Sequence, residues 1–450
     1  MKSKQQLGLF SFTMIVIGLV IGMGIFRTAA TSAKGAIDPS VYFSAWIIGG
    51  FIAICGALTF AEIGSRMPVT GGYYKVFSYA YHPSIAFAVN CVILVSNAAG
   101  VAGVAIIGSG YITKLFPQHL WTDIDKAIIS SVGIIAFYGI NLMGLKTSSL
   151  VQNILMLIKI AMVMLLVACL FSISNYAEQT HLLTHKPINE LAHSLNWIQS
   201  LGVSLIAVSF TCGGYEHTID FGSEIKNPSR NIPRGIFIGI AIVITLYLLV
   251  SLSYYLIIGF ENIKTENEIA YILINKVFGQ TAAKVFSLFL FMGVLAYVNT
   301  LLMSNPRLMF AMGDEGSLPK IFAKQNEKTQ VLTFSLTVFA ALCIIILFFA
   351  QTFDKILNFS IFLDCFGMVA SSAAVFILRK RTKHLNDTGI YKMKYPFLTV
   401  LFIIAYSFVG ISIAIQTPNL ALIGVLVLLG FIIIYFLFAK KNGSRYIQSH

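Results

Sequence analysis

A single lysine lies deep inside a long apolar stretch of the sequence. Lys159 is near the middle of the mostly apolar run 149–173. In a helix that rises 1.5 Å per residue it would lie roughly 15 Å or more from either end, which is too deep for its side chain to reach water unaided. An ammonium group desolvated in this way can bind and release a proton, or it can stay charged as a fixed cation. We therefore predict a functional role for Lys159, with both of these roles open.

Three carboxylates also lie within or at the ends of apolar stretches. Glu216 would either cap nearby backbone N–H groups or relay a proton. Asp364 lies in the apolar run 356–378, where it would either pair with a polar neighbour or act as a pocket acid that favours cationic substrates. Glu62 precedes Arg66 by four residues at a helix end, a spacing that predicts an ion pair or an inner-gate contact.

Glycines interrupt two of the apolar stretches, at positions 18, 22 and 24 in the run 10–32 and at positions 213 and 214 in the run 196–222. Each glycine costs a helix interior about 1 kcal/mol relative to alanine. The first set alone could be a GxxxG packing face between helices. Two interruptions, each in the first helix of a set of five, match transporters built from inverted repeats with discontinuous helices.

A broken helix inside a membrane offers both of the groups that an amino acid needs. The free N–H groups and the dipole at the new helix N-terminus favour a carboxylate. The carbonyl groups released at the other side of the break can accept hydrogen bonds from an ammonium group. A site made largely of backbone therefore fits a zwitterionic amino acid.

Composition shows which elements must hold these groups in place. The chain has 450 residues, of which 57% are hydrophobic and 11% charged, and its mean hydropathy is +0.83. A soluble enzyme, a disulfide scaffold and a disordered chain are excluded, because soluble chains are about 25% charged. Stretches of about 20 apolar residues predict an all-α integral membrane protein with about twelve transmembrane helices. These are roughly 10–32, 41–64, 83–112, 126–144, 149–173, 196–222, 234–259, 280–312, 331–350, 356–378, 396–415 and 419–439.

One transmembrane domain, 1–440, accounts for nearly the whole chain. It would comprise a first repeat over about 10–173, a second over about 196–378 and two extra helices over about 396–439, followed by a cytoplasmic tail, 441–450. Most of the 31 Lys and Arg residues fall on the cytoplasmic side if both termini are cytoplasmic. The net charge of +13 is then explained by topology and by contact with membrane lipid, and no nucleic-acid partner is expected.

At these residues the chain resembles the amino acid–polyamine–organocation superfamily over nearly its full length, and it is most similar in character to bacterial permeases like the L-amino acid transporters. Four segments carry the resemblance in the right order and spacing. They are IGMGIF at 21–26, LTFAEIG at 58–64 with PVTGGYY at 68–74, GGYE at 213–216 with SEIKNPSRNIPR at 223–234, and Asn299 with RLMFAM at 307–312 and DEGSLP at 314–319.

The resemblance implies a leucine-transporter-like fold of five plus five inverted-repeat helices with two more at the C-terminus. It implies that Lys159 takes the place of a bound sodium ion and contacts the broken first helix. It also implies a substrate site with three parts. The amides of Met23 and Gly24, beside Gly22, would hold the carboxylate; the carbonyls of Val20, Phe210, Thr211 and Gly213 would hold the ammonium; and Phe210 would be an aromatic gate, with Cys212 beside it.

Two positions depart from the family pattern. Cys212 stands where the family often has an aromatic residue, which reshapes the side-chain pocket. Met23 stands where the family often has Ser or Thr, which removes a hydroxyl group from the carboxylate site. These departures bear on the size of the substrate.

The sequence thus predicts a sodium-independent secondary transporter of neutral L-amino acids, working by alternating access through proton symport or exchange. The first alternative is a carrier of cationic amino acids or polyamines. The second is a transporter-like nutrient receptor. An enzyme, a metal and a cofactor are not expected, because the eight histidines are scattered. The six cysteines, all in apolar stretches, are expected to be free thiols. No disulfide-linked heavy chain is expected, since residues 111–126 contain no cysteine.

Overall fold

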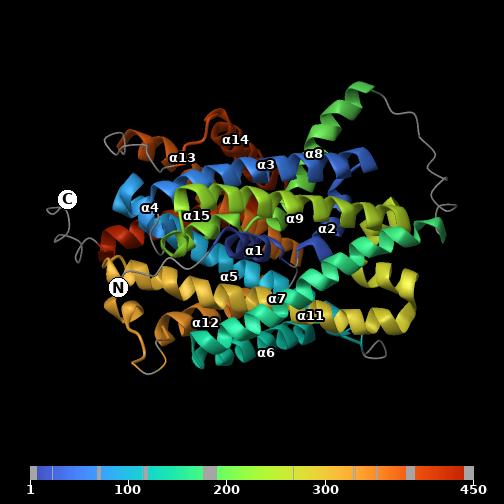
Figure 1. Cartoon of the computed structure of the whole chain (residues 1–450), viewed down its shortest axis with the longest axis horizontal. Helices are drawn as coiled ribbons and strands as arrows, with labels where there is room; N and C mark the ends of the chain where they lie inside the picture. Colours follow the sequence, from blue (N-terminus) through green and yellow to red (C-terminus); the bar gives the residue numbers. More distant parts are fainter. Residues whose placement is uncertain are drawn as a thin grey trace.

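The computed structural model describes residues 8–22, 24–67, 72–113, 115, 120–175, 190–266, 268–327, 329, 331–350, 353–381 and 391–439. Every element within these residues is helical (Figure 1). In this part of the chain nine helices are long and apolar enough to cross a membrane, and Leu9–Val20 and Thr333–Phe348 are shorter apolar helices. With Asp123–Leu142 they account for the twelve predicted spans, which confirms the all-α prediction.

The helices are labelled in chain order. They are α1 (Leu9–Val20), η1 (Gly24–Phe26), α2 (Thr28–Gly35), α3 (Pro39–Arg66), α4 (Gly72–Ala80), α5 (Pro83–Thr113), α6 (Asp123–Leu142), α7 (Leu145–Ala168), η2 (Cys169–Asn175), α8 (Glu190–Cys212), η4 (Tyr215–Glu224), α9 (Pro228–Ile258), α10 (Phe260–Thr265), α11 (Ile269–Asp314), η5 (Lys320–Ala323), α12 (Thr333–Ala350), α13 (Phe353–Arg381), α14 (Phe397–Gln416), α15 (Pro418–Ile434) and η6 (Tyr435–Ala439).

Local sequence explains where several of these helices begin. The Asp38 carboxylate accepts a hydrogen bond from the Val41 N–H at 2.9 Å, and Pro39 opens α3. Thr122 and Asp125 cap each other's backbone N–H groups at the start of α6. These caps satisfy N–H groups that the first turn of a helix leaves unpaired.

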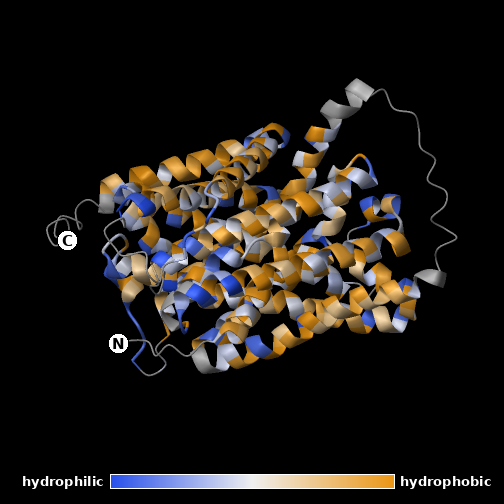
Figure 2. Cartoon of the chain, turned by 45° about the horizontal axis from the view of Figure 1, so that its top comes forward, coloured by the Kyte–Doolittle hydropathy of each residue, from blue (hydrophilic) through white to orange (hydrophobic). Residues whose placement is uncertain are grey.

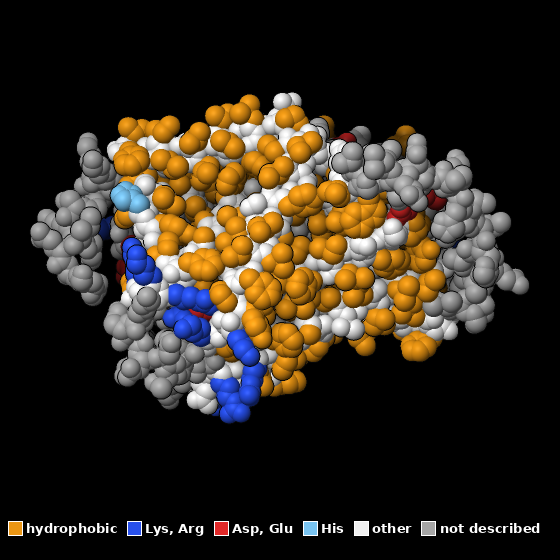
Figure 3. Space-filling view, turned by 90° about the horizontal axis from the view of Figure 1, so that it is seen from above, with side chains coloured by type: hydrophobic (Ala, Val, Ile, Leu, Met, Phe, Trp, Pro, Cys, Tyr) orange, Lys and Arg blue, Asp and Glu red, His pale blue; other side chains and the backbone are white. Residues whose placement is uncertain are grey.

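Hydrophobic residues make up most of the helical ribbons (Figure 2). Large hydrophobic side chains are exposed on α6, α7, α14 and α15, including Ile135, Leu157, Ile415 and Ile433. In the view of Figure 3 orange side chains cover the face, while Lys and Arg gather at the left end, the end that carries α4 in Figure 1. An apolar surface with charge at one end is typical of a multi-pass membrane protein.

The broken helices are packed in a reciprocal way. Helix α1 packs against α9, which follows the second break, and α8 packs against α3, which follows the first, while α3 and α9 pack against each other. A second group, formed by α5, α6, α11 and α12, packs together beside them, and α7 and α13 contact both groups. This exchange of partners between the two halves is what an inverted repeat would produce.

The structure confirms both predicted interruptions and refines the ends of three spans. The run 10–32 is divided into α1, η1 and α2, and the run 196–222 ends as an α-helix at Cys212 and continues as the 3-10 helix η4. The run 280–312 lies in a longer helix, α11, which is kinked at Gly279 with φ 84°. Glycine accepts this positive φ, whereas a residue with a Cβ is strained there.

Candidate functional site

The break in the first span exposes the start of a new helix. Helix α1 ends at Val20, and the chain turns so sharply that the Gly22 N–H donates to the Val20 carbonyl at 2.7 Å. The chain becomes helical again at Gly24, whose carbonyl accepts hydrogen bonds from the Arg27 N–H at 3.0 Å and the Thr28 hydroxyl at 2.7 Å. The first N–H groups of a helix have no partner within it. Gly24 therefore presents its N–H to the gap.

The predicted role of Met23 stays a prediction, because this residue lies outside the described part of the chain. Gly24, the other residue predicted to hold the carboxylate, lies within the described part of the chain. Its position follows from the 3-10 turn that begins there.

The break in the second span exposes the end of a helix. Helix α8 ends at Cys212, so its last carbonyl groups have no intrahelical partner. Gly214 has φ 103°, and a Cβ placed on it would lie 2.5 Å from the Leu19 carbonyl oxygen. The Glu216 carboxylate accepts a hydrogen bond from the Gly214 N–H at 2.9 Å, which confirms the predicted capping role. The backbones of the two broken helices are therefore in direct contact at Gly214.

A pair of threonines joins the two broken helices on the other side of the gap. The hydroxyl groups of Thr28 and Thr211 are in direct contact, and the Ala207 carbonyl lies 2.8 Å from the Thr211 hydroxyl. Because each hydroxyl has one proton, either Thr28 or Thr211 gives up its backbone acceptor when it donates to the other. A Cβ placed on Gly24 would lie 2.7 Å from the Thr211 oxygen. Glycine at position 24 is therefore required for the close approach of the two breaks.

A cavity of about 90 Å³ lies between the breaks. Its wall includes nearly all of the residues predicted for the site. These are Val20, Gly22, Gly24, Phe210, Thr211, Gly213, Lys159, Glu216 and Asp364. Cys212 is buried but does not line this cavity, because each residue of a helix is turned by about 100° from the one before it. Its side chain therefore faces away from the wall that Phe210 and Thr211 form.

Lys159 contacts the broken first helix, as predicted. Its side chain is buried, with 3% of the residue exposed, and its ammonium group donates to the Gly18 carbonyl at 3.4 Å. Helix α7 carries Lys159, and this helix packs against α9 and α11. The lysine thus places a positive charge beside the carbonyl end of α1, where the helix dipole is negative.

Sequence reasoning missed several neutral residues that line the cavity or contact its wall. Tyr247 on α9 donates its hydroxyl to the Val20 carbonyl at 2.9 Å. Ser96 on α5 and Ser360 on α13 each donate to the other's carbonyl at 2.9 Å, and Asn97 donates to Asn305 at 2.8 Å. The polar pair at 96 and 97 inside the apolar run 83–112 was the available signal. Because the Val20 carbonyl already accepts from Gly22 and Tyr247, an ammonium group there would have to displace one of them.

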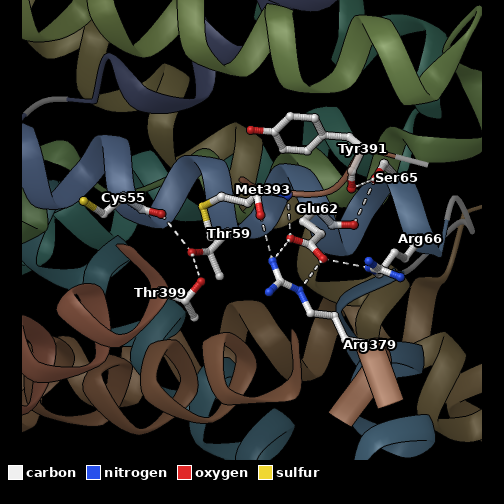
Figure 4. A network of polar contacts seen from close by, with 9 residues as sticks. All are labelled: Cys55, Thr59, Glu62, Ser65, Arg66, Arg379, Tyr391, Met393 and Thr399. Atoms are coloured by element: carbon white, nitrogen blue, oxygen red, sulfur yellow. Dashed lines mark hydrogen bonds and ion pairs between the residues drawn. The ribbon is translucent and has the colours of Figure 1, made fainter. Parts of the chain in front are cut away.

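A second polar site lies away from the cavity, around Glu62 (Figure 4). Its carboxylate is fully buried and accepts from Arg66 Nε at 2.8 Å, from Arg379 at 2.8 and 2.6 Å and from the Met393 N–H at 2.9 Å. The pair with Arg66 confirms the predicted i,i+4 contact. Arg379, which lies 317 residues away in the sequence, was not predicted. The network joins the end of α3 to the end of α13 and to the segment before α14.

Replacement of Glu62 by glutamine is expected to destabilise the protein by about 3–5 kcal/mol, because it removes the buried negative charge that faces Arg66 and the half-buried Arg379. The measurement is the free energy of unfolding in detergent. Glu261→Gln is the matched control, since Glu261 is 76% exposed and pairs with Lys264 at 3.6 Å; such an exposed pair is worth about 0–1 kcal/mol. Equal losses in the two variants would contradict a stabilising role for the buried network.

The chain is similar to known transporters along its whole length. The family model described as "Amino acid permease" matches residues 7–438. The "Serine/threonine exchanger SteT" of Bacillus subtilis (strain 168) is 27% identical over 98% of this chain and 98% of its own length. The "Methylthioribose transporter" of the same organism is 26% identical over 98% and 95%. The human "Large neutral amino acids transporter small subunit 2" is 23% identical over 96% of this chain and 80% of its own length.

Proposed function

Because the chain belongs to the amino acid permease family, we propose that it is a sodium-independent secondary transporter of neutral L-amino acids that works by alternating access. The observation that carries this proposal is the cavity between two broken helices. A helix N-terminus opens on it at Gly24, and the carbonyl end of α8 opens on it near Phe210 and Thr211. These groups match the carboxylate and the ammonium of one zwitterion.

The ammonium of the substrate would be held by the carbonyls of Phe210, Thr211 and Gly213. This assignment is supported by the end of α8 at Cys212 and by the position of all three residues in the cavity wall. Phe210 lines the cavity and would act as an aromatic gate over the bound substrate. Glu216 would hold the break open by keeping the Gly214 N–H paired.

Sodium independence follows from Lys159 in this proposal. Its ammonium lies beside the Gly18 carbonyl and would supply the positive charge that a bound sodium ion supplies elsewhere. The coupling would be proton symport or amino acid exchange.

Alternating access would move the group α1, α3, α8 and α9 against the group α5, α6, α11 and α12. The separate packing of these two groups supports such a motion. We assign the end with Glu62 and Arg379 to the cytoplasm together with both termini, because Lys and Arg gather there (Figure 3). The apolar surface would contact lipid. No disulfide-linked heavy chain is proposed, since residues 111–126 contain no cysteine.

The first alternative is a carrier of cationic amino acids or polyamines, which the carboxylates of Glu216 and Asp364 in the cavity wall favour. The second alternative is a carrier of a sugar-like thioether, because the chain is similar over nearly its whole length to a methylthioribose transporter. Either one would use the same cavity.

Uptake into sodium-free proteoliposomes distinguishes these substrates. Labelled threonine, leucine, arginine, putrescine and methylthioribose are offered to vesicles that are empty or preloaded with the unlabelled compound. The proposal expects threonine or leucine to enter, with arginine and putrescine excluded. Entry of arginine, putrescine or methylthioribose without any neutral amino acid would contradict the substrate class.

A further inference from the structure

The positive and negative charges of the side chains that line the cavity are unequal in number. Lys159 contributes one positive charge and Glu216 and Asp364 contribute two negative charges, while His217, which also lines the cavity, adds a positive charge only when it is protonated. A neutral amino acid enters as a zwitterion and adds no net charge. An unbalanced charge inside a membrane protein is costly, so one further positive charge is required when the cavity closes around its substrate.

The two carboxylates differ in how they are compensated. Glu216 accepts a hydrogen bond from the Gly214 N–H at 2.9 Å and lies 3.5 Å from His217 Nε2. Asp364 accepts no hydrogen bond from any residue in the described part of the chain, and it experiences the negative charge of Glu216. Asp364 is therefore the carboxylate whose negative charge lacks a partner.

Among the described residues, the titratable groups that interact electrostatically with Asp364 include no lysine or arginine. They are Glu216 and Tyr215 of η4, Tyr297 of α11, Tyr406 of α14 and Cys365 of its own helix. His217 lines the same cavity but lies against Glu216, 3.5 Å away, and is a cation only when it is protonated. Helix α5 contributes the neutral Ser96 and Asn97 to the same wall. Lys159 is directed to the Gly18 carbonyl of α1, and Arg379, further along α13, is paired with Glu62.

We propose that Asp364 binds one proton with each neutral amino acid, so that transport is a symport of one proton and one substrate. This inference rests on the proposed function and assigns its coupling site. A proton from the outer water joins the carboxylate when the cavity faces outward. The same proton leaves Asp364 for the cytoplasm when the cavity faces inward, and no other bond is made or broken. Lys159 stays charged throughout as a fixed contact of α1.

The test uses the full-length protein in proteoliposomes with labelled threonine and an inward proton gradient of one pH unit. The wild type is expected to accumulate threonine up to about tenfold, the limit that one proton per substrate sets for that gradient. Asp364→Asn is expected to lose the accumulation and to keep the exchange of internal for external threonine. Asp364→Glu is expected to recover part of the accumulation. Asp314→Asn is the matched control, because Asp314 is exposed at the end of α11.

A second measurement does not depend on the folding of a variant. The measured quantity is the membrane potential at which the wild type shows no net threonine flux. This potential is expected to shift with the proton gradient by the amount that corresponds to one proton, and therefore one charge, per threonine. A flux that carries no charge and no proton would overturn the proposal. Accumulation that survives in Asp364→Asn but is lost in His217→Gln would also overturn it, because the proton would then be bound at His217. If neither the wild type nor any variant exchanges a neutral amino acid, the result contradicts the proposed function itself.

Discussion

Replacement of Gly214 by alanine is expected to lower transport at least about tenfold. Gly214 has φ 103°, and an added Cβ would lie 2.5 Å from the Leu19 carbonyl oxygen and 3.1 Å from the Leu19 carbonyl carbon. The positive φ alone costs an L-residue about 1–2 kcal/mol, and the obstacle is backbone, which cannot rotate away as a side chain can. The two broken helices would have to separate, which displaces Gly24 from Thr211.

The measurement is the rate of threonine exchange at equal amounts of protein in the membrane. Gly139→Ala is the matched control, since a Cβ on Gly139 in α6 would meet nothing within 4 Å, and its rate is expected to stay near that of the wild type. Exchange at the wild-type rate in Gly214→Ala would show that the contact between the two breaks is not needed for transport.

Replacement of Lys159 by methionine is expected to reduce both uptake and exchange by roughly 10- to 150-fold. Methionine keeps most of the side-chain length and removes the charge, so the Gly18 carbonyl loses a buried, charge-assisted hydrogen bond. Such a bond contributes about 1.5–3 kcal/mol. Lys159→Met is expected to lose both exchange and uptake, because Lys159 would support α1. Asp364→Asn is expected to lose only the proton-driven accumulation, because Asp364 would carry the proton.

The measurement compares threonine exchange in Lys159→Met, Lys159→Arg and Lys320→Met. Lys320 is exposed, so its variant controls for the loss of a lysine as such. Lys159→Arg is expected to recover part of the rate because it restores the positive charge. Full exchange in Lys159→Met, with only the proton dependence lost, would instead make Lys159 the proton-binding group.

Local signals in the sequence were sufficient to locate the two breaks. Glycines at 22, 24, 213 and 214 mark the two breaks. Gly214 requires glycine for its positive φ and its close approach to Leu19, and Gly24 for its close approach to Thr211, whereas a Cβ on Gly22 or Gly213 would make only ordinary contacts. Lys159 could be identified because a charge in an apolar run is unexpected unless it has a role. The i,i+4 spacing of Glu62 and Arg66 likewise predicted their contact.

Contacts between distant segments could not be predicted from the sequence. The pairing of Arg379 with Glu62, of Tyr247 with Val20 and of Thr28 with Thr211 depends on how whole helices pack. A single tyrosine or threonine in an apolar run is common and indicates no particular partner. Cys212 was assigned to the site by its neighbours in sequence, but the turn of the helix directs it away from the cavity.

The most direct test of the account asks whether the cavity recognises both ends of an α-amino acid. Exchange of labelled threonine is measured in proteoliposomes against increasing concentrations of unlabelled threonine, its methyl ester, which lacks the carboxylate, and the matching 2-hydroxy acid, which lacks the ammonium. Recognition by the N–H of Gly24 and the carbonyls at the end of α8 requires both groups. The account expects each analogue to need a concentration at least about tenfold higher than threonine. Inhibition by either analogue as strong as that by threonine would contradict recognition of the zwitterion by the two broken helices.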